Sequence, residues 1–146
     1  MAVGDLFWLD AAVDVGAITS SIFSSGDTMS CALVTDASVT STHLSTFASF
    51  TEATTGTYVA SGTTLDTWLD MWANPVGKVA TFDTAVNPTW AAHALHSTNA
   101  TYAVIVNLDD AGKRCVCAVD LGGVDMTAGD LTITWNASGI ATITST

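Results

Sequence analysis

The chain has 146 residues, with 14 acidic side chains against 3 basic ones, so its formal net charge at pH 7 is −11. This length suits one domain with its own core, and a composition of 49% hydrophobic and 12% charged residues excludes an intrinsically disordered chain. Three cationic side chains are too few to neutralise a phosphate lattice, which argues against nucleic acid and anionic membranes as partners.

Serine and threonine, about a quarter of the residues, supply polar surface that charged side chains would otherwise provide. Because threonine is β-branched and favours strands, we expect an all-β protein, mainly an antiparallel β-sandwich or jelly-roll-like fold with at most one short helix. No linker or repeat divides the chain, which predicts a single domain over 1–146, with 1–27 as a candidate N-terminal arm. No apolar run could span a bilayer, and Asp5 stands where a signal peptide would carry positive charge.

The first two thirds of the chain carry several weaker strand and helix patterns. A strand is predicted over 29–35, and a helix over 40–50, where apolar residues recur at helical steps. Further elements are predicted, in chain order, as strands over 57–60 and 65–72, a turn at 74–77 from which 78–82 leads out, and an element that begins at Asn87.

The clearest alternation begins at residue 101. Residues 101–108 form a predicted strand, and residues 114–119 form the returning strand after a turn at 109–112. One face of the first strand is expected to carry Tyr102, Val104, Val106 and Leu108.

The end of the chain continues this pattern. Leu131, Ile133 and Trp135 alternate with polar residues and are expected to face inward. A hairpin loop at 136–139 then leads to a last strand over 140–144, which would complete an antiparallel meander.

The residue types of a catalytic triad are all present, but no pattern connects them. The chain has His43, His93 and His96 and many serines and aspartates, yet it lacks the Gly-x-Ser-x-Gly turn that exposes a nucleophile in many hydrolases. We therefore expect no catalytic residue, and a small hydrolase is the third functional class to test.

Two spacings approach those of metal ligands. His93 and His96 are three residues apart, and Cys115 and Cys117 would present two thiols on one strand face. One intervening residue is poor spacing for zinc, and a disulfide between these positions would be strained, so both cysteines are expected to be small buried hydrophobic residues.

Calcium is the remaining metal to consider. The aspartates at positions 120, 125 and 130 match no calcium loop, because the ligands of such loops alternate at one-residue intervals. Calcium bound between loops stays an alternative, although no cofactor or metal is predicted.

The five tryptophans suggest a contact surface. Trp68 and Trp72 share one face of a predicted strand with two aspartates, a mixture that is unusual for a core. Two interpretations stay open: core or subunit-interface residues, and a stacking platform for sugar rings. The residues expected at a subunit or capsid interface are Phe7, Trp8, Trp68 and Trp72.

Several stretches resemble small virion proteins of tailed bacteriophages. Residues 52–65 resemble their Glu-x-x-Gly-x-Gly-Tyr-x-x-x-Gly-x-x-Leu stretch, with Thr57 in place of the glycine before Tyr58 and Ser61 where a second glycine often occurs. Shorter similarities lie at 87–90, 102–105 and 117–123, and the closest match is 129–140.

The resemblance implies a structural, non-catalytic virion component: a capsid decoration or cement protein on the outer surface of a phage head, made in the host cytoplasm. The implied partner is the major capsid protein, and a homotrimer would suit the three-fold positions of an icosahedral shell. An acidic exterior fits this place, because it would repel DNA. The alternative is a tail or head-fibre adhesion module that binds host-surface carbohydrate.

Overall fold

The computed structural model describes residues 6–8, 27–39, 46–53, 55–65, 79–82, 84, 86–96, 99–136 and 140–144. Its elements are β1 (Leu6–Trp8), β2 (Met29–Val34), the 3₁₀ turn η1 (Phe47–Ser49), β3 (Thr63–Thr64), β4 (Val79–Phe82), β5 (Thr89–Trp90), β6 (Ala100–Asn107), β7 (Cys115–Val124), β8 (Leu131–Thr132) and β9 (Ala141–Thr144). The predicted all-β class is confirmed. Within these ranges, no helix has the length and apolar character needed to cross a membrane.

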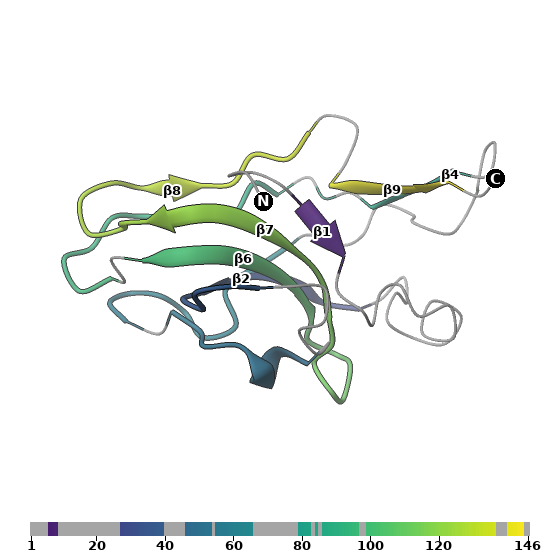
Figure 1. Ribbon diagram of the computed structural model, residues 1–146, viewed down its shortest axis with the longest axis horizontal. Helices are drawn as coiled ribbons and strands as arrows, with labels where there is room; N and C mark the ends of the chain where they lie inside the picture. The colour runs from purple at the N-terminus through teal and green to yellow at the C-terminus, as the bar shows by residue number, and fades with distance from the viewer. Residues whose placement is uncertain are drawn as a thin grey trace.

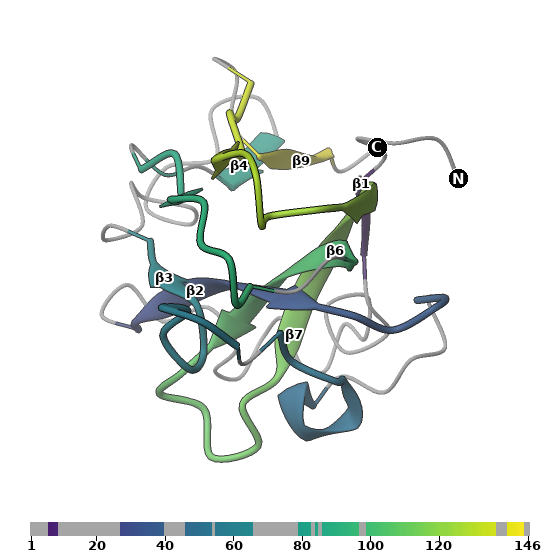
Figure 2. The ribbon, with the colours of Figure 1, turned by 90° about the vertical axis from the view of Figure 1, so that its left-hand side faces the viewer.

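A five-stranded antiparallel sheet of order β1-β7-β6-β2-β3 forms the centre of the molecule (Figure 1). Its middle is the predicted hairpin, in which β6 turns back into β7, and β2 pairs with β6 from Met29 opposite Asn107 to Val34 opposite Tyr102. Figure 2 shows β2, β6 and β7 as one curved sheet, with the separate β4–β9 pair above it.

The central sheet is covered on both faces, which explains why its strands are nearly continuous apolar runs. All six residues of β2 are buried, and Ala103 to Val106 of β6 are fully inaccessible. Fully burying a valine, leucine or isoleucine side chain stabilises the fold by roughly 1.5–3 kcal/mol relative to leaving it exposed to water. These strands therefore form the most stable part of the described chain.

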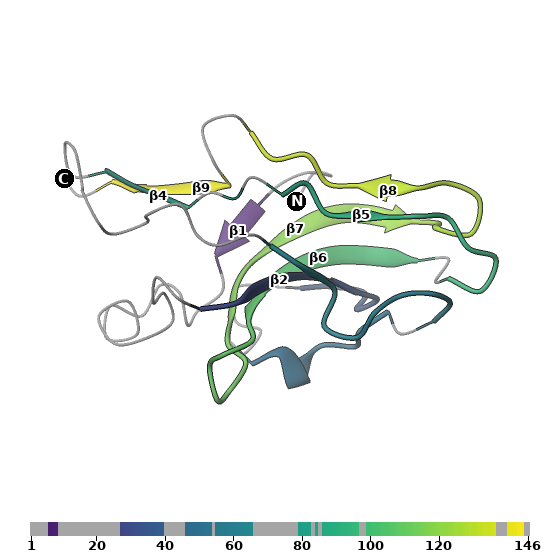
Figure 3. The same cartoon turned by 180° about the vertical axis from the view of Figure 1, so that it is seen from behind.

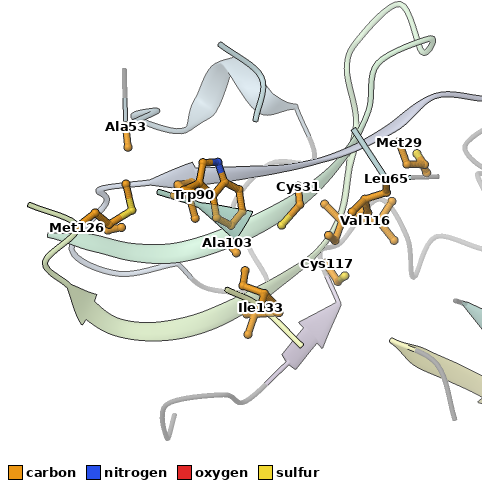
Figure 4. Packing of buried hydrophobic residues seen from close by; sticks show 14 residues of the cluster. Met29, Cys31, Ala53, Leu65, Trp90, Ala103, Val116, Cys117, Met126 and Ile133 are labelled. Atoms are coloured by element: carbon orange, nitrogen blue, oxygen red, sulfur yellow. The ribbon is translucent and has the colours of Figure 1, made fainter. Parts of the chain in front are cut away.

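One face of the sheet packs against β5 and β8, which pair with each other and lie above β7 in Figure 3. Trp90 of β5 and Ile133, just after β8, join Cys31, Ala103 and Ile105 of the sheet in one buried cluster (Figure 4). The strand β8 is shorter than expected, but its alternation is as predicted: Ile133 is buried, and Leu131 and Trp135 pack against the cluster. The sandwich or jelly-roll arrangement stays a prediction.

The opposite face is covered by η1 and the turn that follows β2. Phe47, Phe50 and Val39 pack there against a second cluster. The four β6 residues expected to share a face do so, because Tyr102, Val104 and Val106 belong to this cluster and Leu108 packs against it. The helix predicted over 40–50 is not seen at 46–50, where only the single turn η1 forms, and residues 40–45 lie outside the described residues.

A β-bulge corrects the expectation for the two neighbouring cysteines. Ile105 pairs with Cys117 and Val106 with Cys115, so Val116 is an extra residue in β7. The extra residue reverses the alternation, and Cys115 therefore joins the cluster under η1 while Cys117 joins the cluster under β5 and β8. The thiols lie on opposite faces of the sheet rather than on one, and both are buried as predicted.

Two predictions in the rest of the chain are wrong. Residues 57–60 form turns rather than a strand. The last strand does not complete a meander with β8: β9 pairs with β4, and β8 pairs with β5. In the second case the local pattern was that of a hairpin, but pairing with distant segments decided the outcome. Most of the strand predicted over 65–72 lies outside the described residues.

The N-terminal strand β1 adds to the edge of β7. Phe7 pairs with Ala118 and Trp8 with Cys117 of the same chain. A role for 1–27 as an arm that reaches a neighbour stays a prediction.

Candidate functional site

Three loop segments meet where β6 begins and β7 ends, and we call residues 55–62, 91–96 and 125–130 the loop end (Figures 1 and 3). Hydrogen bonds join the segments: the His93 N–H donates to the Met126 carbonyl (3.1 Å), and the Ala92 N–H donates to Asp130 Oδ1 (2.7 Å). The loop end contains two of the histidines and two of the aspartates that the sequence singled out. Connecting loops held on a rigid sheet are common places for binding residues.

His96 ties two of these segments together. It is 6% exposed, its Nδ1 lies 2.9 Å from the Thr55 carbonyl oxygen, and its Nε2 lies 3.1 Å from the Ala91 carbonyl oxygen and 3.3 Å from Thr57 Oγ1. Carbonyl oxygens only accept hydrogen bonds, so the ring N–H donates to one of these two carbonyl groups, and the tautomer decides which one. We call His96 a clasp, because its ring lies between carbonyl groups of two loops and holds these loops together.

Gly56 makes room for this clasp. Its backbone is left-handed, with φ +72°, and a Cβ at this position would lie 2.7 Å from His96 Nδ1 and 3.2 Å from His93 Nδ1. A glycine is needed both for the conformation and for the close approach of the ring. The next residue, Thr57, places its hydroxyl oxygen 3.3 Å from His96 Nε2.

His93 and His96 lie beside each other, and both rings make contacts within the protein. Their rings meet edge to face with centroids 5.4 Å apart, and His93 Nδ1 accepts the Leu95 N–H (3.2 Å). Within the part of the chain that the structure describes, no group of three or more His, Cys, Asp or Glu side chains is placed to hold a metal ion. Asp125 instead caps its own turn, accepting the N–H and the hydroxyl of Thr127.

The segment 52–62 is anchored on β2 by polar groups. Glu52 accepts the Ser61 N–H at 2.5 Å, the Leu33 N–H donates to the Tyr58 hydroxyl at 2.9 Å, and the Ser30 hydroxyl donates to the Ser61 carbonyl. Burial raises the pKa of the Tyr58 phenol, an effect that the nearby Glu52 carboxylate increases. The phenol therefore stays protonated and serves as a fixed anchor.

The loop end also exposes two apolar side chains. Val59 and Leu95 are the exposed large hydrophobic residues of the described part of the chain, and each side chain is 69% exposed. Val59 lies on the segment anchored by Tyr58, and Leu95 directly precedes His96. Sequence reasoning missed both residues, because a single exposed aliphatic residue in a loop leaves no periodic pattern.

The residues predicted at an interface are not brought together by the described part of the structure. Trp68 and Trp72 lie outside the described residues, as does His43. Phe7 and Trp8 are placed only through the backbone pairing of β1. Of the other tryptophans, Trp90 is 6% exposed in the core, and Trp135 is half-buried and donates its indole N–H to the Val86 carbonyl (2.9 Å).

The three cysteine thiols lie in the core, away from the protein surface. All three are free and buried, and burial raises the pKa of each thiol. A thiol that stays protonated in an apolar core is a poor nucleophile and a poor metal ligand.

Comparisons with protein-family models, with curated proteins and with solved structures found no match to this chain.

Proposed function

We propose that this protein is a capsid decoration protein that binds the outer surface of a phage head and stabilises the contacts between capsomers. In this role it would act without catalysis, as a homotrimer on the major capsid protein. The proposal rests on the resemblance of 52–65 and 129–140 to small virion proteins of tailed bacteriophages, together with what those residues do in the fold.

The observation that carries the proposal is that the residues of the 52–65 motif hold the motif to β2. The Tyr58 hydroxyl accepts the Leu33 N–H, the Ser61 carbonyl accepts the Ser30 hydroxyl, and the buried Leu65 donates its N–H to the Met29 carbonyl. Glu52 fixes Ser61 within the motif. A motif whose members hold a loop against a strand supports a structural role for these residues.

The surface chemistry supports docking on another protein. Val59 and Leu95 offer apolar contact area, at roughly 25 cal/mol per Å² of surface removed from water, on two loops that His96 holds together. With a net charge of −11, the rest of the surface would resist non-specific association and contact with DNA. Phe7, Trp8, Trp68 and Trp72 remain proposed contacts from the sequence.

The test is a comparison of heads assembled without the protein and the same heads after purified protein is added. We expect DNA release to move to a higher temperature when the protein is bound. The double variant V59D/L95D should bind heads at least about tenfold more weakly, because two desolvated acids would oppose docking.

Ala111 provides the matched control for this variant. It is an exposed small apolar residue in the turn between β6 and β7, at the end of these strands opposite the loop end. A111D should bind heads as the unmodified protein does. Unchanged DNA release after saturation with protein would overturn the decoration role. Equal binding of V59D/L95D and A111D would remove the loop end from the proposed contact.

A further inference from the structure

A small polar hollow lies beside the loop end, where the pairing of β6 and β7 is interrupted. Between the pairs Tyr102–Asp120 and Ala100–Val124, one residue of β6 faces three residues of β7. The strands therefore separate locally and leave a hollow of about 220 Å³. Its lining consists of Ala37, Asn99, Thr101, Tyr102, Asp120, Gly122 and Gly123.

Two consecutive glycines shape the floor of this hollow. Gly122 and Gly123 are both left-handed, with φ +70° and +81°, a conformation that side chains rarely adopt. A Cβ at Gly123 would also lie 2.6 Å from Asn99 Oδ1. The glycines thus expose their backbone and leave the Asn99 amide in place at the rim.

The remaining walls are fixed by hydrogen bonds. Thr101 Oγ1 lies 3.0 Å from the Val34 carbonyl oxygen and 2.7 Å from that of Asp36, which ties the turn bearing Ala37 to β6. Asp120 Oδ1 accepts the Gly122 N–H at 2.8 Å. The hollow is therefore preformed, and binding would cost little ordering of the protein.

We propose that this hollow binds one ring of a neutral sugar, a property separate from the decoration role. Its volume of about 220 Å³ suits a single small ring rather than an extended ligand, since pockets for drug-sized ligands hold roughly 300–1,000 Å³. The Asp120 carboxylate accepts hydrogen bonds and the Asn99 amide both donates and accepts, which matches hydroxyl groups that do both. Tyr102, which is 9% exposed, is the aromatic residue of the lining, and an aromatic residue suits the carbon face of a sugar.

The charge of the lining selects against other small ligands. The seven lining residues include one carboxylate and no lysine, arginine or histidine, so phosphates and carboxylates would meet repulsion without a counter-charge. A primary ammonium ion is the competing ligand that Asp120 could attract. The experiment below therefore includes one.

The test is an NMR titration of the ¹⁵N-labelled full chain with glucose, galactose, N-acetylglucosamine and ethylammonium chloride, each taken to about 100 mM, since a ligand of this size binds in the millimolar range. We expect at least one sugar to shift the backbone amides of residues 99–102 and 120–123. A37W should abolish these shifts, because the indole would fill the hollow from an exposed position.

D120N should weaken binding at least about threefold while keeping the oxygen that caps Gly122. D125N is the matched control, because Asp125 caps Thr127 in the same manner outside the hollow, and it should bind as the unmodified protein does. Three results would overturn the proposal: no shift with any sugar, sugar shifts that persist in A37W, or shifts at these residues with ethylammonium alone. None of these results depends on whether the protein binds phage heads.

Discussion

The backbone of Gly62 lies directly against the carbonyl group of Cys31. A Cβ at Gly62 would fall 2.0 Å from the Cys31 oxygen and 2.6 Å from the Ala32 Cα, far inside contact distance. Because Cys31 is in the buried middle of β2, this approach places the loop 55–62 flush against the central sheet. The position of the loop, and of the exposed Val59 that it carries, thus depends on one residue without a side chain.

We predict that G62A destabilises the protein by about 3 kcal/mol or more, because the new methyl group clashes with fixed backbone and φ is +80°. Urea unfolding followed by tryptophan fluorescence would measure the loss. G129A is the matched control, since a Cβ at Gly129 would meet nothing within 4 Å. Equal midpoints for the two variants would contradict the proposed close approach.

The neighbouring residue should respond in the opposite direction. Ser61 has φ +71°, which costs a residue with a side chain roughly 1–2 kcal/mol, whereas glycine in the unfolded chain costs about 0.5–1 kcal/mol in entropy. Both hydrogen bonds of Ser61 use its backbone and survive the change. We therefore expect S61G to raise stability by about 0.5–1 kcal/mol, or a melting temperature higher by about 2–4 °C in calorimetry. A lower melting temperature would show that the serine side chain contributes contacts here.

The parts of the fold that sequence reasoning predicted are those governed by local pattern. The hairpin of β6 and β7 has two long apolar strands joined by a turn in which Asp110 binds the N–H groups of Gly112 and Arg114, and this information lies within neighbouring residues. The alternation of residues along β6 also predicts that Tyr102 and Val104 lie on the same face of the sheet, as they do.

What could not be predicted depends on distant partners. The pairing of β9 with β4 joins residues about 60 positions apart and has no local signal. The bulge at Val116, which sends Cys115 and Cys117 to opposite faces, arises from register with β6 rather than from composition. At the loop end, the spacing of His93 and His96 suggested metal ligands. The carbonyl groups next to the His96 ring belong to residues 5 and about 40 positions away, and a local pattern does not show such contacts.

The clasp at His96 should make a measurable contribution to stability. Replacing it by alanine removes the ring N–H that donates to the Thr55 or the Ala91 carbonyl group and opens a cavity, so we expect H96A to lose about 2–3 kcal/mol in urea unfolding. H93A is the control: His93 is less buried and accepts one local N–H, so its loss should be below about 1 kcal/mol. A larger loss for H93A would contradict the role assigned to His96.

The contribution of the turn between β6 and β7 to stability should depend on pH in the acid range. The Arg114 guanidinium, 2.6 Å from Asp110 Oδ1, holds the pKa of that carboxyl below its usual range. A carboxyl whose folded-state pKa is lowered stabilises the fold above its unfolded-state pKa of about 3.9, and this contribution disappears as the pH falls through the lower folded-state value. NMR titration should show the Asp110 pKa rising toward its usual value in R114Q. An unchanged pKa would assign the shift to the backbone N–H groups of the turn instead.

The three buried cysteines provide a probe of how the sheet opens. Burial raises the pKa of each thiol, and Cys31, Cys115 and Cys117 are all inaccessible, so Ellman's reagent should label none of them in the native protein and all three after unfolding in guanidinium. When reclosing is faster than labelling, the slow native rate reports the free energy of opening. Labelling of all three thiols should therefore accelerate in G62A and slow in S61G, by the factors that correspond to their changes in stability. Rapid labelling of any one cysteine in the unmodified protein would show that its strand opens locally, against the complete burial of these residues in β2 and β7.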